Sequence, residues 1–235
     1  MKITIISDIH GNFDALAALP DDYDELWVLG DLVNYGPQPA EVIDYVRSRA
    51  AQVVQGDHDY CVGFDVSLRC PPNLQKTAEG ARDYTKSILS EGDRKYLREL
   101  PLQAEVFALK KHFWLCHATP SQPLFPDCLR DSELWPHECK RVQADILLVG
   151  HTHIPFKRQI GTTLLLNPGS LGQANLDGEY NYAVLVDGKA SFRSFPIESE
   201  RTVRKIREML LPTGMQNHLI EILLKGALYF NERID

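Results

Sequence analysis

Residues 1–60 alternate short apolar runs with stretches of helical spacing, and this alternation constrains the fold more than any other feature of the sequence. The runs at 3–6, 26–29 and 52–55 are short and continuous, as buried strands are. Between them, 13–19 and 39–49 have helical spacing, and a proline opens the second stretch, where it suits a first turn. The order βαβαβ predicts a parallel sheet with helices on its faces.

The rest of the chain predicts mainly strands, followed by a helical tail. Residues 73–100 have helical spacing, and Pro101 ends that stretch. Strands are expected at 106–109 and 113–116, as a hairpin around Lys110-Lys111, and then at 146–149, 162–166, 182–186 and 190–195. From residue 198 the pattern becomes helical in two pieces, broken at 212–214. We therefore predict a main domain at 1–197 and a C-terminal helical extension at 198–235 that packs on it.

Length and composition exclude several kinds of protein. The 235 residues are enough to bury a core without disulfides, and the 5 Cys, an odd number with no C-x-x-C pair, fit reduced thiols. A net charge of −7 argues against a stable nucleic-acid partner, which would require an excess of Lys and Arg. No apolar run is long enough for a signal peptide or a membrane span. We expect a cytoplasmic protein with no membrane partner.

Five of the apolar runs have Asp or His within two residues of their carboxyl ends. In open α/β sheets, ligands bind beyond the carboxyl ends of the strands, so these side chains are expected to share one edge. The residues, in chain order, are Asp8 and His10; Asp31; Asp57, His58 and Asp59; His117; and His151 and His153. Of the 8 His in the chain, five belong to this set, which makes a common purpose the better interpretation.

The chemistry of these residue types indicates a metal centre. Carboxylate and imidazole groups together suit divalent cations of the Zn, Mn, Fe, Co and Ni group. Glycine precedes three of the clusters and allows the backbone to turn sharply and approach the site. In an extended chain, residues i and i+2 point the same way, so Asp8 and His10 are expected to face one site while Ile9 enters the core. Each motif alone is more often a polar turn, but the five together predict a metal centre.

The ordered set D-x-H, G-D, G-[N/D]-H-D, H and G-H-x-H resembles the calcineurin-like metallophosphoesterase superfamily. Residues 7–12, 30–37 and 167–170 are similar to its small bacterial and archaeal members, and the resemblance extends from residue 2 to about 196. It implies an α/β fold, a four-layer α/β/β/α sandwich of two mixed β-sheets flanked by helices. It also implies a hydrolase that cleaves phosphodiester or phosphomonoester bonds in a small phosphorylated substrate.

The family pattern implies how the site is divided between two divalent cations. One would be held by Asp8, His10, Asp31 and His153, and the other by Asp31, Asp57, His117 and His151. Asp31 would bridge the cations together with a hydroxide that attacks phosphorus in line. His58 would donate a proton to the leaving alkoxide or stabilise its charge, and Asp59 would orient nearby groups.

Two positions depart from the family pattern. Asp57 stands where the family usually has Asn, and the additional carboxylate is expected to tighten metal binding and to lower the reactivity of the centre. Asn34-Tyr35 stand where the protein Ser/Thr phosphatases have Asp-Arg, which support the catalytic His and grip the phosphate. The second departure favours a phosphodiesterase or a phosphatase of small molecules over a phosphoprotein phosphatase.

Two other functions stay open. A hydrolase directed at nucleotides, such as dinucleoside polyphosphates or cyclic nucleotides, would use the same centre, although no residue indicates a base-reading pocket. A non-catalytic binding module is the alternative from another class, because some members of the superfamily keep the scaffold and bind protein partners. The presence of His58 and of four candidate His ligands argues against the binding module. The helical extension offers a surface through which the chain could form a homo-oligomer.

Overall fold

The computed structural model describes residues 1–125, 128–174, 178–196 and 199–226. The strands are β1 (Lys2–Ile6), β2 (Glu25–Val28), β3 (Ala50–Val53), β4 (Gln103–Ala108), β5 (Lys111–Cys116), β6 (Ile146–Leu148), β7 (Phe156–Ile160), β8 (Thr163–Asn167), β9 (Tyr180–Val186) and β10 (Lys189–Phe195). The helices are α1 (Phe13–Ala17), α2 (Pro39–Arg49), α3 (Asp57–Phe64), α4 (Pro72–Ile88), α5 (Glu91–Glu99), α6 (Trp135–Val142), α7 (Ser199–Glu208) and α8 (Thr213–Lys225).

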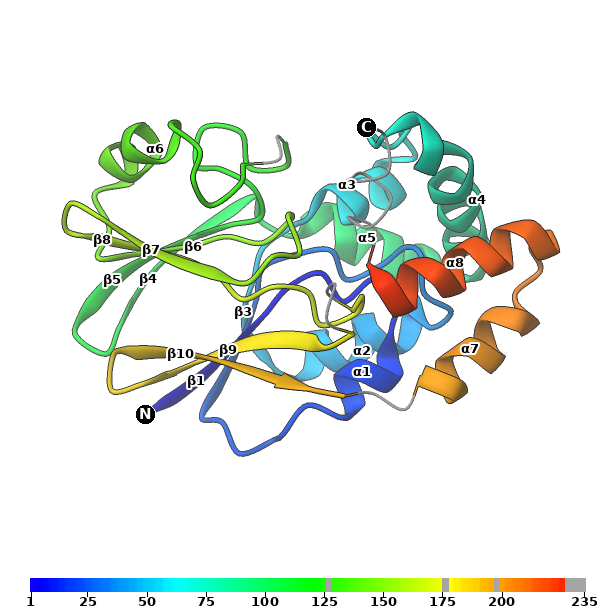
Figure 1. The fold of residues 1–235 in the computed structure, drawn as a ribbon, viewed down its shortest axis with the longest axis horizontal. Coiled ribbons are helices and arrows are strands. Elements are labelled where there is room, and N and C mark those ends of the chain that lie inside the picture. The colour runs from blue at the N-terminus through cyan, green and yellow to red at the C-terminus, as the bar shows by residue number, and fades with distance from the viewer. Residues whose placement is uncertain (126–127, 175–177, 197–198, 227–235) are drawn as a thin grey trace.

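The strands form two five-stranded sheets that pack face to face (Figure 1). One sheet has the order β10-β9-β1-β2-β3 and the other β4-β5-β6-β8-β7. Both sheets are mixed. Strand β1 runs parallel to β2 but antiparallel to β9, and β6 runs parallel to β5 and β8, whereas β4 is antiparallel to β5. The parallel core predicted for residues 1–60 is confirmed, because β1, β2 and β3 are parallel neighbours.

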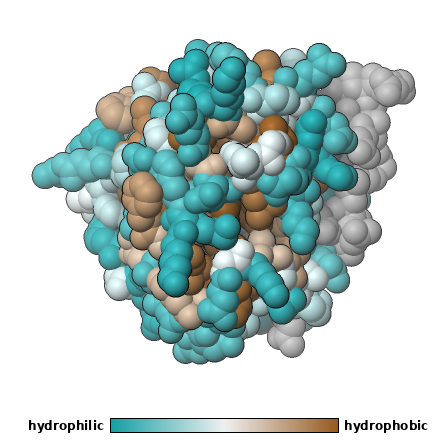
Figure 2. All heavy atoms as spheres, turned by 90° about the vertical axis from the view of Figure 1, so that its left-hand side faces the viewer, coloured by the Kyte–Doolittle hydropathy of each residue, from teal (hydrophilic) through white to brown (hydrophobic). Residues whose placement is uncertain are grey.

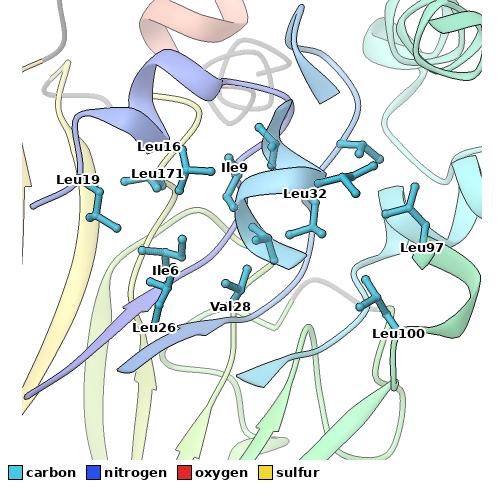
Figure 3. Packing of buried hydrophobic residues seen from close by; sticks show 14 of the residues in the cluster. Ile6, Ile9, Leu16, Leu19, Leu26, Val28, Leu32, Leu97, Leu100 and Leu171 are labelled. Carbon is cyan, nitrogen blue, oxygen red and sulfur yellow. The ribbon is translucent and has the colours of Figure 1, made fainter. Parts of the chain in front are cut away.

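Alternate residues of β1 belong to two different cores. Ile3 and Ile5 pack between the sheets, where Trp27 and Phe113 meet edge to face with ring centroids 5.0 Å apart. Ile6 packs on the opposite face, in the cluster that Figure 3 shows from close by. A fully buried aliphatic side chain contributes about 1.5–3 kcal/mol. Strand β1 is thus held from both sides, and the polar residues at its carboxyl end start from a fixed position.

Helix α6 covers the outer face of the second sheet. Its Trp135 and Cys139 are buried in one cluster with Leu147 and Leu165 of that sheet. On the outer face of the first sheet, the corresponding cover is α1 and α2. The order of helices, sheet, sheet and helix confirms the predicted four-layer α/β/β/α sandwich.

The C-terminal helices pack on the side of the molecule that carries α4 (Figure 1). Ile206 of α7 and Ile222 of α8 are buried in one cluster with Tyr35. Asp14 of α1 accepts hydrogen bonds from Lys205 Nζ at 2.7 and 2.8 Å and from Thr202 Oγ1 at 3.0 Å. The boundary between a domain at 1–197 and an extension at 198–235 stays a prediction, and residues 198 and 227–235 lie outside the described ranges.

Several predicted boundaries are wrong by a few residues. Residues 73–100 form two helices, because Ser90 caps the second and its Oγ accepts the Asp93 backbone N–H at 3.1 Å. The strand expected at 52–55 lies at 50–53 as β3. The hairpin turn lies at Leu109 and Lys110, which both have positive φ. The break in the tail precedes residue 213, because α8 already begins there.

Strand β7 and helix α3 were not predicted from the sequence, because neither contains an apolar run. Residues 157 and 159 of β7 are exposed, so this edge strand has no continuous hydrophobic face. Helix α3 opens on Asp57, His58 and Asp59, and these polar residues are buried. Asp57 and His58 therefore lie in the first turn of a helix, beyond the strand end at which they were expected.

The end of the sandwich from which β1 starts has a mainly hydrophilic surface. Figure 2 shows this face, with smaller hydrophobic areas between the polar side chains. In Figure 1 the N-terminus lies at this end, so β1 runs away from it and its carboxyl end points toward the helices. None of the helices within the described ranges has the length and apolarity needed to cross a bilayer.

Candidate metal centre

The chain bends sharply at most of the predicted ligands. Five of them have left-handed backbone conformations: Asp8 (φ 56°), His10 (47°), Asp31 (55°), His151 (66°) and His153 (59°). The expectation that D-x-H and H-x-H are extended is therefore wrong, although Ile9 does enter the core as predicted. Residues other than glycine rarely adopt this backbone conformation. It persists where surrounding contacts impose it, most often at functional sites.

The first group of ligands joins the end of β1 to the loop after β6. Asp8, His10 and His153 each offer a ligand atom, and these atoms lie within 4.8 Å of one another. The Nε2 atoms of His10 and His153 are 3.0 Å apart, and His153 Nε2 lies 3.4 Å from Asp8 Oδ1. Asp31 lies beside this group, with its Oδ2 3.7 Å from His10 Nε2.

The second group comes from α3, β5 and the loop after β6. Asp57, His117 and His151 also have ligand atoms within 4.8 Å of one another. Asp57 Oδ1 lies 3.2 Å from His117 Nε2 and 3.1 Å from His151 Nδ1. Asp31 Oδ2 is 3.4 Å from His117 Nε2, so this carboxylate lies between the two groups. The structure thus brings all seven predicted ligands close together. Ligand atoms of Asp8, Asp31 and His117 also lie within 4.8 Å of one another, so the division of the ligands between two cations stays a prediction.

Backbone contacts orient the ligands. The Nδ1 of His117 lies 2.6 Å from the carbonyl oxygen of Leu29, which fixes the ring and aims Nε2 at the carboxylates. A metal-ligating His typically donates its second ring N–H in this way. The carbonyl of Asp8 accepts hydrogen bonds from Ser170 Oγ at 2.8 Å and from the Gly172 backbone at 2.9 Å. Ser170 belongs to the stretch 167–170 that is similar to members of the family, and together with Gly172 it holds the first ligand in place.

The pKa values of several side chains in the cluster are strongly shifted. Burial lowers the pKa of His10 to about 3, although Asp31 opposes this, so the ring is the neutral form that binds a metal. Burial raises the pKa of Asp57, but His58 and His151 outweigh it and hold that pKa well below its usual range. Burial lowers the pKa of His117, but Asp31 outweighs it and raises that pKa well above the usual value. A ring proton on His117 thus offsets buried negative charge that a cation would also neutralise.

His58 lies beside both groups without belonging to either predicted ligand set. Its Nε2 is 4.0 Å from Asp31 Oδ2 and 3.9 Å from Asp57 Oδ2. Its Nδ1 lies 2.7 Å from the amide nitrogen of Asn34, whose Oδ1 accepts the Tyr35 backbone N–H at 2.9 Å. The acceptance of the Tyr35 N–H identifies Oδ1, and the amide nitrogen can only donate, so His58 Nδ1 accepts and Nε2 carries the ring hydrogen toward the centre. The sequence identified Asn34 only as a departure from the family, not as the partner of His58.

Asp59 fixes the backbone around the centre. Its carboxylate accepts backbone N–H groups from Leu32 at 2.8 Å, Val33 at 3.3 Å and Gly56 at 3.0 Å. Burial and the charge of Asp31 raise the pKa of Asp59 to about 8, against these hydrogen bonds. Asp59 thus ties the chain after Asp31 to the start of α3.

Gly56 allows Asp31 to approach the start of α3. A Cβ on Gly56 would lie 2.1 Å from Asp31 Oδ1 and 2.3 Å from the Asp31 backbone nitrogen. The short distance lets the His58 backbone N–H donate to Asp31 Oδ1 at 2.9 Å. The predicted role of this glycine in close backbone approach is confirmed.

We expect Gly56→Ala to destabilise the protein by about 1–3 kcal/mol, because the added methyl group overlaps buried backbone. Urea unfolding measures the change. Gly214→Ala is the matched control, since a Cβ at Gly214 meets no atom within 4 Å, and its stability should be unchanged or slightly higher. Equal stability of Gly56→Ala and the wild type would contradict the packing described here.

The donor chemistry fits divalent cations. Asp8 Oδ1 is buried and has no hydrogen-bond donor within the described residues, and two imidazole nitrogens face each other 3.0 Å apart. A buried carboxylate oxygen without a donor is unfavourable in a bare protein and is stabilised when it binds a cation. The two imidazole nitrogens can share one ring hydrogen, and both can bind a cation once that hydrogen is lost. Nitrogen and oxygen ligands in this proportion suit Zn, Mn, Fe, Co or Ni.

The chain matches the calcineurin-like phosphoesterase superfamily domain over residues 1–189. It is 30% identical to an uncharacterized protein of Methanocaldococcus jannaschii, and the alignment covers 95% of this chain and 98% of that one. The crystal structure of a metallophosphoesterase from Sphaerobacter thermophilus superposes with a TM-score of 0.77 and 25% identity, covering 93% of this chain and 98% of the other.

The chain is also similar to nucleotide hydrolases over part of its length. It is 33% identical to the symmetrical bis(5'-nucleosyl)-tetraphosphatase of Vibrio campbellii. The alignment covers 57% of this chain and 52% of that protein, so about half of each is shared.

Proposed function

Because the chain belongs to the calcineurin-like phosphoesterase superfamily, we propose that it hydrolyses phosphodiester or phosphomonoester bonds at a centre of two divalent cations. The observation that supports the proposal is the convergence of Asp and His side chains from five separate segments into two adjacent groups, with Asp31 near His10 of one group and His117 of the other. One cation would be held by Asp8, His10, Asp31 and His153, and the other by Asp31, Asp57, His117 and His151. When bound, such cations activate water as a nucleophile and neutralise phosphoryl oxygens.

The chain's own residues would complete the site in two ways. His58 directs Nε2–H toward the centre and would donate it to the leaving oxygen or stabilise the charge there, supported by its distances to Asp31 and Asp57. Asn34 and Asp59 are positioning residues in this proposal. Asn34 holds the His58 ring and Asp59 holds the backbone that carries Asp31 and Asp57.

The test of the proposed function is hydrolysis of para-nitrophenyl phosphate and of bis(para-nitrophenyl) phosphate by metal-stripped protein, with Mn, Zn, Fe, Co or Ni added back in turn. We expect no turnover without metal and turnover with at least one of the five cations. The ratio of the two rates separates a phosphatase from a phosphodiesterase. Equal rates with and without added metal would contradict the proposal.

Dinucleoside polyphosphates are a second candidate substrate class, because tetraphosphatases are among the relatives. They carry several linked phosphates, so attack of water at an inner phosphorus would break a P–O–P bond and release a nucleoside phosphate, a better leaving group than an alkoxide. We extend the proposal to a small phosphorylated substrate in the cytoplasm; the net charge of −7 argues against nucleic acid as a stable partner. A homo-oligomer formed through the C-terminal helices would be tested by deleting residues 198–235 and measuring the mass in solution.

We expect Asp57→Asn to weaken metal binding by about tenfold and to raise kcat by about two- to tenfold, the scale of removing one nearby charge. Asp57 lies 3.2 Å from His117 and 3.1 Å from His151, and its negative charge opposes the approach of an anionic phosphate. Asn keeps the shape of the side chain and one oxygen ligand. Metal titration and steady-state kinetics measure the two effects. The control is Asp44→Asn, at an exposed position of α2. A variant with unchanged metal affinity and no gain in rate would contradict this interpretation of Asp57.

A further inference from the structure

In the described residues, the recorded ion-pair partners of the centre's carboxylates are imidazole rings. Within the described ranges, Asp8, Asp31 and Asp57 form ion pairs with His rings and with no Lys or Arg. A phosphate held by the cations would therefore be neutralised by them alone. Any further phosphate of the same substrate would need a cationic group farther out.

Arg69 lies on the segment between α4 and α3, the helix that carries Asp57 and His58. Its neighbours Leu68 and Cys70 pack in the same cluster as Tyr35. The Tyr35 ring in turn contacts the centre, with its centroid 5.2 Å from that of His10 and 5.0 Å from that of His58. Residue 69 thus lies between two residues of the cluster that contains Tyr35, while its own side chain is exposed.

Phe125 brings a second loop to Arg69. This loop leaves β5 directly after His117, and the Ala118 backbone N–H donates to the Pro123 carbonyl at 2.7 Å, which turns the loop back toward the ligand. Arg69 Cζ lies 4.7 Å from the centroid of the Phe125 ring. Helix α3 and the loop after β5 lie at the same upper edge in Figure 1. The pair therefore joins the two segments that carry Asp57, His58 and His117.

The contact with Phe125 positions the Arg69 guanidinium without using its N–H groups. A cation–π contact is made to the ring face, and a guanidinium keeps five N–H donors for other partners. In the part of the chain that the structure describes, Arg69 has no carboxylate partner, and its recorded contact is the Phe125 ring. A positioned guanidinium with free donors matches the geometry of a phosphate group.

We propose that Arg69, held by Phe125, binds a second phosphate of the substrate, so that the site selects molecules with at least two linked phosphates. This inference rests on the proposed function, because the first phosphate is the one bound at the metal centre. A nucleoside polyphosphate and an inorganic polyphosphate offer the same second phosphate. The experiment therefore uses both.

The test compares the selectivity of the wild type and Arg69→Ala, each loaded with metal. The substrates are para-nitrophenyl phosphate, inorganic tripolyphosphate and a symmetrical dinucleoside tetraphosphate. We expect Arg69→Ala to lower kcat/KM for the two polyphosphates by about 10- to 100-fold, mainly through KM, and to affect the aryl phosphate much less. Phe125→Leu should give a smaller loss in the same direction. Arg193→Ala, on the edge strand β10, is the control and should match the wild type.

Two outcomes would overturn the inference: equal losses on all substrates, or no loss on either polyphosphate. A loss confined to the dinucleoside tetraphosphate would support Arg69 and identify the nucleotide as the source of the phosphate. Calorimetric binding of tripolyphosphate gives the same comparison without turnover. If the wild type turns over no substrate with any metal, the proposed function fails, while weaker binding to Arg69→Ala would still support the inference.

Discussion

His58→Ala is expected to lower kcat for para-nitrophenyl phosphate by about 10²- to 10⁴-fold, the usual contribution of a positioned proton donor. The reason is the placement of the ring: Nδ1 is held by Asn34 at 2.7 Å, and Nε2 points between Asp31 and Asp57. The loss should appear in kcat rather than in KM, since the interaction with the leaving oxygen forms in the transition state. Steady-state kinetics and bound-metal analysis of the same sample measure the result.

The metal content of His58→Ala decides between two roles for this residue. His58 also has a ring nitrogen within 4.8 Å of ligand atoms on His10 and Asp31, so it could itself hold a cation. The proposed role as proton donor predicts that the variant keeps the metal content of the wild type. Loss of one equivalent would contradict that role and make His58 a ligand. His137→Ala, exposed on α6, is the control and should change neither property.

Asp31→Ala is expected to remove at least one cation and to lower kcat/KM by about 10³-fold or more, equal to several kcal/mol of transition-state stabilisation. Asp31 Oδ2 lies 3.7 Å from His10 and 3.4 Å from His117, so this carboxylate is shared by both ligand groups. Loss of the Asp31 carboxylate would also remove a negative charge that stabilises the protonated ring of His117. Bound-metal analysis and kinetics measure the two effects.

The control for Asp31→Ala is Asp44→Ala, which removes an exposed carboxylate from α2. Asp44→Ala should keep full metal content and activity. A metal content of Asp31→Ala equal to that of the wild type would contradict the shared position of Asp31. Urea unfolding of both variants shows whether a loss of activity reflects the centre or a loss of folded protein.

The proximity of these Asp and His side chains could be predicted because they follow strand ends. Asp8 lies two residues beyond β1 and His117 directly follows β5, and a sheet brings the ends of its parallel strands to one edge. The local backbone was predicted wrongly. The left-handed conformations of His10 and His153 depend on contacts across the fold, such as the hydrogen bonds from 170 and 172 to Asp8, which a local pattern does not contain.

Contacts between distant segments could not be predicted from the sequence either. Asn34 and His58 are 24 residues apart, and nothing in their spacing predicts that the amide meets the ring. Arg69 and Phe125 belong to loops with no periodic pattern, so their contact depends on how α3 and β5 are placed. Helix α3 was missed because its buried face is polar, which is the consequence of carrying the ligands.

The most direct test of the two-cation centre is a titration of metal-stripped protein with Mn²⁺ in which bound metal and the rate of para-nitrophenyl phosphate hydrolysis are measured together. We expect two equivalents of Mn²⁺ to bind and turnover to rise as the second equivalent is taken up. Folded protein that binds both equivalents but shows no turnover with Mn, Zn, Fe, Co or Ni would contradict the account and favour a non-catalytic binding module.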